Sequence, residues 1–256
     1  MRTTPKVVGG LTPACTERAV AAYRTIVDDV VAVSTPEVAE LSKLLENIFR
    51  SVNIALVNEL AILAHRMGID IWEVVDAAAT KPFGFMPFQP GPGMGGHCLP
   101  VDPFYLAWRA REYDFPTEFV ELAGKVNQEM PQFCVERVAR ALNDAGSAVR
   151  GADVLVLGVA YKPGVADTRE SPALKIIAGL LERGAAVSYH DPHVPDLPRA
   201  GLHSRPLDEA LAAADIAVVV TAHPELDYAD IASRVPRLLD LRGVTRGIDA
   251  AGVERL

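Results

Sequence analysis

One short loop of this 256-residue chain brings together residue types that can do covalent chemistry: Gly95-Gly96-His97-Cys98-Leu99-Pro100-Val101-Asp102-Pro103. Glycines let a backbone approach a ligand closely. The thiol of Cys98 follows them, and Asp102 stands four residues past the sulfur. A cysteine in a polar, glycine-opened loop has the surroundings of a nucleophile. Free cysteines are also common as small buried hydrophobes, so the loop alone leaves a nucleophile and a packing residue equally open.

A second group of polar residues shares one face of a predicted helix. Lys43 and Asn47 stand four residues apart, and Glu40 and Arg50 extend the same stripe. A lysine that faced a site could stabilise an oxyanion, and an asparagine could orient a water molecule. Most charged side chains lie on solvated helix faces, so the spacing alone favours an ordinary exposed stripe.

The segment 160–172 has the character of a phosphate-binding loop. It carries two cations, Lys162 and Arg169, and it ends at Ser171-Pro172, a typical helix start. Backbone N–H groups at a helix N-terminus attract phosphate, and nearby cations strengthen that attraction. An ordinary charged loop is the alternative.

The run Gly91-Pro92-Gly93-Met94-Gly95-Gly96 satisfies G-x-G-x-x-G but stands in the wrong context for a dinucleotide fingerprint. That motif must leave a strand and open a helix. Here it follows a Phe-Gln-Pro sequence and leads into His-Cys-Leu-Pro. We therefore expect its glycines to let a loop wrap around a substrate.

The other chemically interesting residues are predicted to be structural. Cys15, Cys134, Trp72 and Trp108 fit core packing. The segment 190–193, His-Asp-Pro-His, is expected to make a turn at a strand end, although strand ends in this kind of sheet can also touch a ligand. No cluster of cysteine, histidine and carboxylate has zinc spacing, so no metal is predicted.

Composition limits the function classes. Half of the residues are apolar, which allows a sizeable core, and the net charge of −8 argues against a nucleic-acid surface. Three cysteines make no disulfide framework and fit a reducing cytoplasm. We find no uninterrupted apolar run of membrane-spanning length and no signal-peptide core, so no membrane partner is expected.

The order of the predicted elements indicates an α/β protein with three parts. Residues 1–34 read as the strand–helix–strand end of a Rossmann layer. Residues 35–131 read as a central all-helical domain, and residues 132–256 as a Rossmann-like parallel α/β domain. The central part is dominated by a helix over 36–67, about 48 Å long, which we expect to form a homodimer interface.

Further elements follow from apolar periodicity, Gly and Pro. The expected helices span 13–27, 70–80, 104–112, 116–130, 132–145, 172–183, 207–213 and 228–233. The expected strands span 6–8, 30–33, 154–159, 186–190, 216–220 and 238–241.

Four stretches, in this order and spacing, together resemble the nucleotide-sugar 6-dehydrogenases of the UDP-glucose/GDP-mannose dehydrogenase family. They are residues 39–47, 58–60, 93–102 and 161–172. The sequence Cys-Leu-Pro-Val-Asp at 98–102, in place of Cys-Phe-Pro-Lys-Asp, is similar to the UDP-N-acetylglucosamine and UDP-N-acetylmannosamine 6-dehydrogenases within the family.

The resemblance implies oxidation of a sugar C6 alcohol to a carboxylate with NAD, a reaction of polysaccharide biosynthesis. Cys98 matches the nucleophile, which forms a thiohemiacetal and then a thioester. Lys43 matches the residue that stabilises the oxyanion, and Asn47 matches its hydrogen-bonding partner. Asp102 matches the aspartate associated with water activation.

The resemblance also implies a UDP-sugar as the binding partner. The residues that match substrate contacts are Phe85, Phe88, Gly91, Gly93, Gly95, Gly96, Tyr161, Lys162 and Arg169. Arg169 is also expected to contact the cofactor.

The chain departs from the family pattern at its beginning. The family starts with a full NAD domain that carries a genuine G-x-G-x-x-G, whereas only the last strand and helix of that domain are expected here. The chain by itself is therefore expected to be inactive for want of the fingerprint. The alternatives are a non-catalytic UDP-sugar-binding module and a thioester hydrolase that uses Cys98 and Asp102.

Overall fold

The computed structural model describes residues 2–256 and divides into two compact units, Met1–Arg50 and Ser51–Leu256. In the first unit, β1 (Lys6–Val8) pairs in parallel with β2 (Val30–Ala32), and α1 (Pro13–Tyr23) connects them. Thr12 caps α1 by accepting a hydrogen bond from the Cys15 N–H at 3.2 Å. The strand–helix–strand arrangement that the sequence predicts is confirmed.

The long helix α2 spans Pro36–Met67, and its predicted bounds are confirmed. The Thr35 hydroxyl accepts a hydrogen bond from the Val38 N–H at 3.3 Å, and Gly68 follows the last turn with a φ of +69°. By length and composition α2 could cross a membrane, since one window has a mean hydropathy of 1.2. That is weak support, because in the second unit α2 buries the polar side chains of Ser51 and Asn58, as a core helix of a globular domain does.

The second unit is built on a five-stranded parallel sheet in the order β4-β3-β7-β8-β9. Its strands are β3 (Asp153–Leu157), β4 (Ala186–His190), β7 (Ile216–Val219), β8 (Leu238–Asp240) and β9 (Val253–Arg255). A short antiparallel pair, β5 (Asp196–Leu197) and β6 (Leu202–His203), follows β4.

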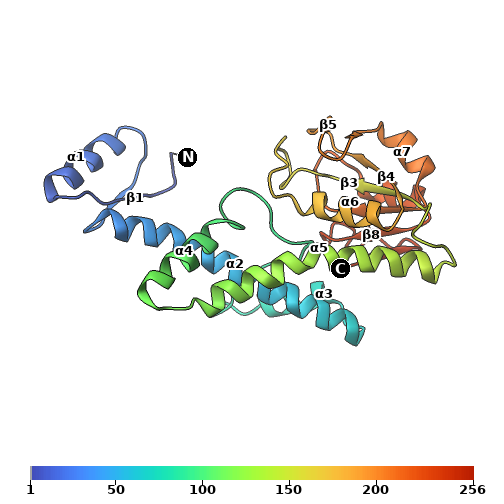
Figure 1. Cartoon of the computed structure of the whole chain (residues 1–256), viewed down its shortest axis with the longest axis horizontal. Coiled ribbons are helices and arrows are strands. Elements are labelled where there is room, and N and C mark those ends of the chain that lie inside the picture. The colour runs from blue at the N-terminus through green and yellow to red at the C-terminus, as the bar shows by residue number, and fades with distance from the viewer. Residues whose placement is uncertain (1) are drawn as a thin grey trace. The chain divides into compact units, whose positions relative to one another are not determined.

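Helices cover both faces of this sheet, so each central strand is apolar on both sides. Val154 and Val156 of β3 belong to the core cluster that α5 (Glu118–Asp144) and α6 (Pro172–Glu182) also supply, whereas Leu155 and Leu157 belong to the opposite cluster. The second cluster is covered by α7 (Leu207–Ala213) and α8 (Tyr228–Arg234). Figure 1 shows α5 and α6 lying along the sheet within this unit.

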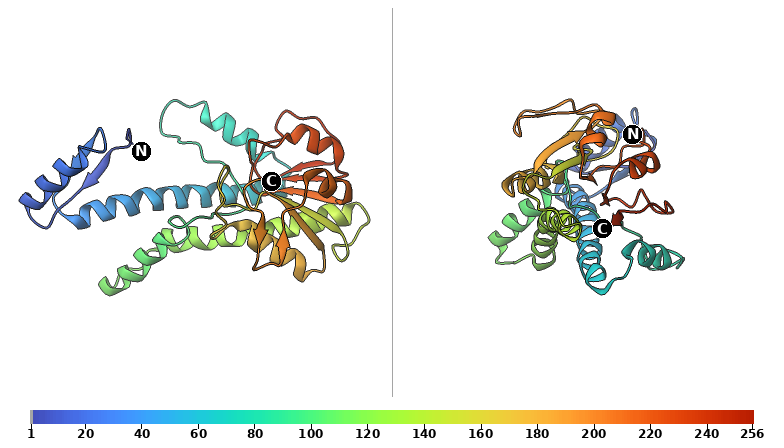
Figure 2. Two further views of the ribbon diagram at one scale, coloured as in Figure 1. Left: turned by 90° about the horizontal axis from the view of Figure 1, so that it is seen from above. Right: turned by 90° about the vertical axis from the view of Figure 1, so that its right-hand side faces the viewer.

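One long helix, α5, replaces the two helices that the sequence predicts on either side of Pro131. It runs unbroken through the proline, and Figure 2 draws this green to yellow-green segment as one long helix. Proline lacks an N–H and removes one helix hydrogen bond, but packing holds α5 together, since Met130, Cys134 and Val138 are all fully buried. The predicted boundary between residues 131 and 132 therefore falls inside a helix, and the three-part division of the chain stays a prediction.

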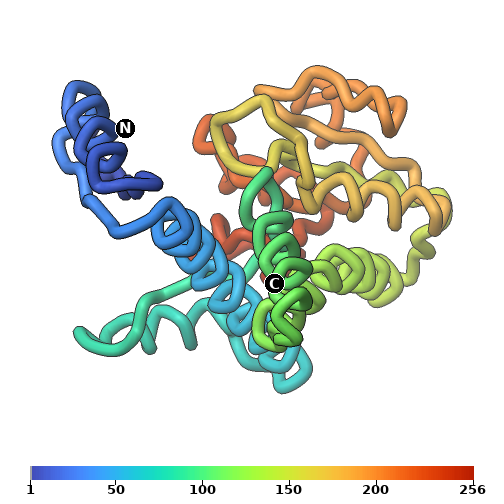
Figure 3. The backbone as a smooth tube through the Cα atoms, turned by 60° about the vertical axis from the view of Figure 1, so that its left-hand side comes forward, coloured from blue at the N-terminus to red at the C-terminus, as the bar shows by residue number. Residues whose placement is uncertain are grey.

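The segment between α3 (Ile71–Ala79) and α4 (Asp102–Ala110) has no regular secondary structure. Figure 3 traces it as an open loop between the two helices. Asp70 caps α3 by accepting a hydrogen bond from the Trp72 N–H at 2.8 Å. A 3-10 turn, η1 (Arg111–Tyr113), ends α4.

Four packing predictions can be compared with burial. Trp72 and Cys134 are buried, as expected. The predictions for Cys15 and Trp108 are wrong: Cys15 is exposed, and Trp108 is 64% exposed. Cys15 lies in the first turn of α1, a helix with no buried residue, and Trp108 lies on the outer face of α4.

We predict that two glycines on either side of β3 differ sharply in their tolerance of alanine. Gly151 and Gly158 have φ values of +83° and +79°, but an added Cβ meets nothing within 4 Å at Gly151 and lies 2.2 Å from the Thr221 carbonyl oxygen at Gly158. Both substitutions pay a left-handed backbone cost of about 1–2 kcal/mol. Gly158→Ala should lose about 1–3 kcal/mol more from overpacking.

Urea unfolding of Gly151→Ala and Gly158→Ala measures the difference directly. Equal losses of unfolding free energy would show that the close approach to Thr221 relaxes at no cost.

Candidate active site

The loop that carries the predicted nucleophile begins on two buried asparagines. The Gly91 N–H donates to Asn58 Oδ1 at 2.9 Å, and Asn58 Nδ2 donates to Asn127 Oδ1 at 2.9 Å. Asn58 comes from α2 and Asn127 from α5, and both are buried. A side-chain amide can donate and accept at the same time. The two asparagines therefore link α5 to α2, and α2 to the start of the loop, through consecutive hydrogen bonds.

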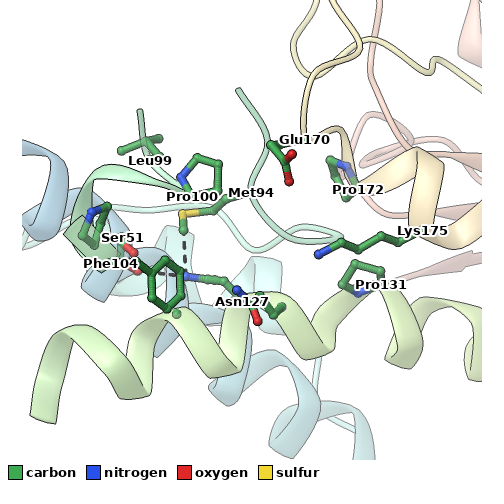
Figure 4. Close-up of a pocket in the computed structure, with 13 residues that line it drawn as sticks. Ser51, Met94, Leu99, Pro100, Phe104, Asn127, Pro131, Glu170, Pro172 and Lys175 are labelled. Carbon is green, nitrogen blue, oxygen red and sulfur yellow. Dashed lines mark hydrogen bonds between the residues drawn. The ribbon is translucent and has the colours of Figure 1, made fainter. Parts of the chain in front are cut away.

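The amide nitrogen of Asn127 contacts two further segments of the protein. Nδ2 donates to the Ser51 carbonyl at 3.1 Å and contacts the Met94 sulfur at 3.6 Å. Figure 4 shows the Asn127 side chain between these two groups. Sequence reasoning missed Asn127; the signal was a polar side chain at a position of α5 that otherwise faces the core.

The proline in α5 creates the place where the loop docks. Pro131 has no N–H, so the helix leaves the Asn127 carbonyl without its usual i+4 donor. A Cβ added to Gly93, whose φ is +117°, would lie 2.9 Å from that carbonyl oxygen and 3.4 Å from the Pro131 ring. Gly93 therefore packs against the Asn127 carbonyl at the point where α5 lacks one of its backbone hydrogen bonds.

Two further glycines of the loop pack against the segment 161–172. A Cβ on Gly95 would lie 2.9 Å from the Glu170 carbonyl oxygen, and one on Gly96 would lie 3.0 Å from the Tyr161 ring. The Gly96 N–H donates to the Arg169 carbonyl at 3.0 Å. These glycines allow the protein's own segments to come close, which is a different role from the expected wrapping of a substrate.

Cys98 is exposed and lies one turn before α4. Its carbonyl accepts hydrogen bonds from the Asp102 N–H at 2.8 Å and the Val101 N–H at 3.2 Å. The thiol and the half-buried carboxylate of Asp102 are thus held one helical turn apart. By contrast, burial raises the pKa of the Cys134 thiol to about 12, which leaves it inert at neutral pH.

Lys43 and Asn47 lie together in the first unit. Lys43 Nζ donates to Asn47 Oδ1 at 3.1 Å, and Arg50 Nη2 donates to the same oxygen at 2.6 Å. Asn47 is 1% exposed, whereas Lys43 is exposed. The contact follows from the four-residue spacing, and the exposed ammonium is held by its neighbour.

The cations of the segment 160–172 differ in how they are held. Arg169 Nε and Nη2 donate to the Asp167 carboxylate at 3.0 and 2.6 Å, and this hydrogen bonding lowers the pKa of Asp167 to about 2. Lys162 is exposed, with Nζ 5.4 Å from the centroid of the Tyr161 ring. Ser171 Oγ caps α6 by accepting the Ala173 N–H at 3.3 Å, so the predicted helix start is confirmed.

The other residues that match substrate contacts lie along the loop before Cys98. Phe85 is exposed, whereas Phe88 packs against the main core. A Cβ on Gly91 would lie 2.9 Å from Nη1 of Arg242. Burial lowers the pKa of Arg242, a cation that sequence reasoning did not single out.

A cavity adjoins the loop that carries Cys98. Leu99, Pro100 and Phe104 line one side, and Glu170 and Lys175 line another. In Figure 4 the Lys175 ammonium points toward the middle of the cavity. Cys98 is not among its lining residues, so the cavity adjoins the loop without holding the thiol.

A group that could hold a metal ion lies at the carboxyl edge of the sheet, where none was predicted. Donor atoms of His193, His223 and Glu225 lie within 4.8 Å of one another. His193 Nε2 is already 3.0 Å from Glu225, and His223 Nε2 is 3.0 Å from the buried carboxylate of Asp191. The atoms that could bind a metal ion are therefore already engaged in hydrogen bonds within the protein.

The residues described here do not form a cradle for the pyrophosphate of NAD. In residues 2–256 the only G-x-G-x-x-G run lies in the loop at 91–96, where neighbouring protein atoms crowd its glycines. The two glycines after β1 are also occupied: a Cβ on Gly9 would lie 2.0 Å from the Thr35 carbonyl, and the Gly10 N–H donates to Thr16 at 3.0 Å.

Sequence comparison supplies the family. The central domain of the UDP-glucose/GDP-mannose dehydrogenase family matches residues 37–129, and the UDP binding domain of the same family matches residues 155–247. The chain belongs to the UDP-glucose/GDP-mannose dehydrogenase family. The family resemblance that the sequence motifs predict is confirmed.

Relatives within the family are N-acetylhexosamine enzymes by name. The chain is 35% identical over 248 residues to the UDP-N-acetyl-D-mannosamine dehydrogenase of Methanocaldococcus jannaschii, covering 93% of this chain and 55% of that protein. It is 34% identical to the NDP-N-acetyl-D-galactosaminuronic acid dehydrogenase of Ralstonia nicotianae, covering 93% and 56%. The chain spans about half the length of these relatives.

A solved structure shows the same fold. The UDP-D-ManNAc dehydrogenase of Pyrococcus horikoshii matches with a TM-score of 0.86 at 31% identity, covering 99% of this chain and 59% of that one.

We predict that Asn58→Ala destabilises the fold by about 2–4 kcal/mol. The substitution leaves the Gly91 N–H and Asn127 Oδ1 without their buried partner, at about 1–3 kcal/mol for each. Asn143→Ala, at an exposed position near the end of α5, is the control and should change stability by less than about 0.5 kcal/mol. Urea unfolding gives both values.

Amide hydrogen exchange at Gly91 should accelerate in Asn58→Ala alone. Unchanged protection of that amide would mean that Asn58 does not hold the loop.

Proposed function

We propose that this chain carries the nucleotide-sugar-binding and covalent-catalysis parts of a nucleotide-sugar 6-dehydrogenase. The observation that supports this most is the hydrogen bond between the Gly96 N–H and the Arg169 carbonyl. It joins the loop of Cys98 to the segment that carries Lys162 and Arg169. One molecule with a diphosphate and a terminal sugar carbon can therefore meet both the cations and the thiol.

The proposed substrate is a UDP-N-acetylhexosamine. The match of residues 155–247 to a UDP binding domain supports the nucleotide, and the names of the relatives support an N-acetylated hexose. The Cys-Leu-Pro-Val-Asp sequence at 98–102 supports an N-acetylhexosamine in place of glucose, and the gluco and manno sugars are the two alternatives.

The chemistry proposed for this chain is the formation and hydrolysis of a thioester. Two hydrides must leave the substrate, one when the C6 alcohol becomes the aldehyde and one when the thiohemiacetal becomes the thioester. The family resemblance implies NAD as the acceptor of both. Between these oxidations the Cys98 sulfur adds to the aldehyde, a C–S bond forms, and the carbonyl oxygen takes up the proton that the thiol gives up. Asp102 then takes a proton from water as that water attacks, the C–S bond breaks, and the thiolate is restored.

Lys43 and Asn47 complete the proposed machinery. An ammonium lowers the energy of an oxyanion as it develops, and the hydrogen bond at 3.1 Å to Asn47 restrains the Lys43 side chain. Their action on the same thioester as Cys98 is part of the proposal.

The proposed assembly is a cytoplasmic homodimer that uses α2. Exposed apolar side chains recur along this helix and support an interface of that kind: Leu41, Leu45, Leu56, Leu60 and Leu63.

We predict that UDP-N-acetylglucosamine or UDP-N-acetylmannosamine protects Cys98 from alkylation. Cys98 and Cys15 are both exposed, so Cys15 is an internal control in the same chain. At a ligand concentration about ten times Kd, the rate of Cys98 modification by iodoacetamide should fall about tenfold, and the rate at Cys15 should stay constant. Peptide mass spectrometry follows both sites. Equal rates at Cys98 with and without a bound sugar nucleotide would place the substrate elsewhere.

We also predict the effect of two substitutions in a form of the protein that includes a complete NAD domain. Cys98→Ser should keep UDP-sugar affinity and abolish acid formation, because an alcohol cannot form the thioester. Lys43→Ala should lower turnover on the order of 10²–10³-fold. NADH absorbance and acid analysis measure both.

Full turnover in Cys98→Ser would refute covalent catalysis. Binding of UDP-sugar without any NADH in the unmodified protein would instead identify a non-catalytic binding module.

A further inference from the structure

One buried carboxylate ties together the ends of neighbouring strands. Asp191 follows β4, and its Oδ2 accepts the N–H groups of Val159 and Ala160, which follow β3, at 2.7 and 3.0 Å. Its Oδ1 accepts the N–H groups of His193 and Val194 at 2.8 and 3.1 Å. Ligands in parallel α/β sheets bind at this carboxyl edge.

His223, which follows β7, connects this carboxylate to the segment 160–172. Its Nε2 lies 3.0 Å from Asp191 Oδ2, and its Nδ1 lies 3.3 Å from the nitrogen of Gly164. A backbone N–H can only donate, so Nδ1 is the acceptor and Nε2 carries the proton given to Asp191. Both side chains are 0% exposed.

The contact at Gly164 falls between the two cations of the segment. Lys162 precedes it by two residues and Arg169 follows it by five. Two other hydrogen bonds hold the base of the segment. The Thr221 hydroxyl donates to the Ala160 carbonyl at 2.6 Å, and the Tyr161 N–H donates to the Asp167 carbonyl at 2.8 Å. His223 reaches beyond these bonds to the exposed turn.

We infer that His223 is a positioning residue for the diphosphate of the nucleotide sugar. By bridging Asp191 and the Gly164 N–H, it holds the turn that presents Lys162. A buried carboxylate that accepts the Nε2 proton makes Nδ1 a stronger acceptor. This inference rests on the proposed function, in which the segment 160–172 receives the diphosphate.

The test separates the two contacts of the ring. His223→Asn places a carbonyl oxygen near the position of Nδ1, where it can accept the Gly164 N–H, but it cannot reach Asp191. His223→Gln places an N–H near the position of Nε2, where it can donate to Asp191, but it offers Gly164 no acceptor. His203→Gln, at an 83% exposed side chain, is the control.

The two His223 variants should rank in opposite orders in two measurements. One is their affinity for UDP, from calorimetric titration, and the other is their stability, from urea unfolding. His223→Gln should weaken UDP binding about tenfold, which is about 1.4 kcal/mol, and remain the more stable of the two. His223→Asn should bind UDP within about threefold of the unmodified chain and be the less stable. A merely structural histidine would make affinity follow stability.

Amide exchange at Gly164, measured without ligand, separates the possible failures. It should accelerate in His223→Gln and stay unchanged in His223→Asn and His203→Gln. Unaltered exchange in His223→Gln, or equal UDP affinity in both variants, overturns the role of His223. A chain that binds no UDP, while Gly164 exchange follows the expected pattern, overturns the proposed function and leaves the bridge itself established.

Discussion

The hydrogen bond between the side chains of Asn58 and Asn127 is the constraint on which the second unit's site depends. It is buried and joins α2 to α5, and it leaves the Asn127 nitrogen as a donor and the Asn58 oxygen as an acceptor for other groups. The donor binds the Ser51 carbonyl, and the acceptor receives the Gly91 N–H. Because an unmatched amide is costly in an apolar interior, the loop is held to the helices by the need to satisfy these groups.

The proline in α5 and the glycines of the loop act together to dock the loop against the rest of the unit. Pro131 frees a carbonyl on the helix surface, and Gly93 is the residue that fits against it. Gly95 and Gly96 then bring the chain against the segment 161–172. A G-x-G-x-x-G run is thus used here for docking between loops and helices. The pattern of glycines alone does not reveal this, because close approach to protein and close approach to a ligand need the same missing Cβ.

The fold was predictable where local signals act alone. The bounds of α2, β4 and α7 follow from Thr and Pro at helix starts, Gly at helix ends and short apolar runs. The break at Pro131 was wrong because burial of Met130 and Cys134 outweighs one lost hydrogen bond. The prediction that Trp108 packs in the core was wrong. Periodicity shows which residues share a helix face, but it does not show whether another element of the chain covers that face.

The site was predictable only within single segments. Four-residue spacing placed Lys43 and Asn47 on one helix face, and the family resemblance implied the hydrogen bond between them. A Ser-Pro pair predicted the start of α6. The pairs Asn58–Asn127 and Asp191–His223 span 69 and 32 residues along the chain, and no local pattern connects such partners. They are set by tertiary packing, which one sequence does not display.

Arg169 is already paired before any ligand arrives. Its guanidinium donates to the Asp167 carboxylate at 3.0 and 2.6 Å, and this hydrogen bonding lowers the pKa of Asp167 to about 2, so the carboxylate is ionised at neutral pH. The Arg169 side chain is 63% exposed, and exposed ion pairs contribute little to stability. Under the proposed function, an anion that recruited Arg169 would have to replace this tethered carboxylate. The gain in affinity from the arginine would then be the difference between two interactions and not the whole of one.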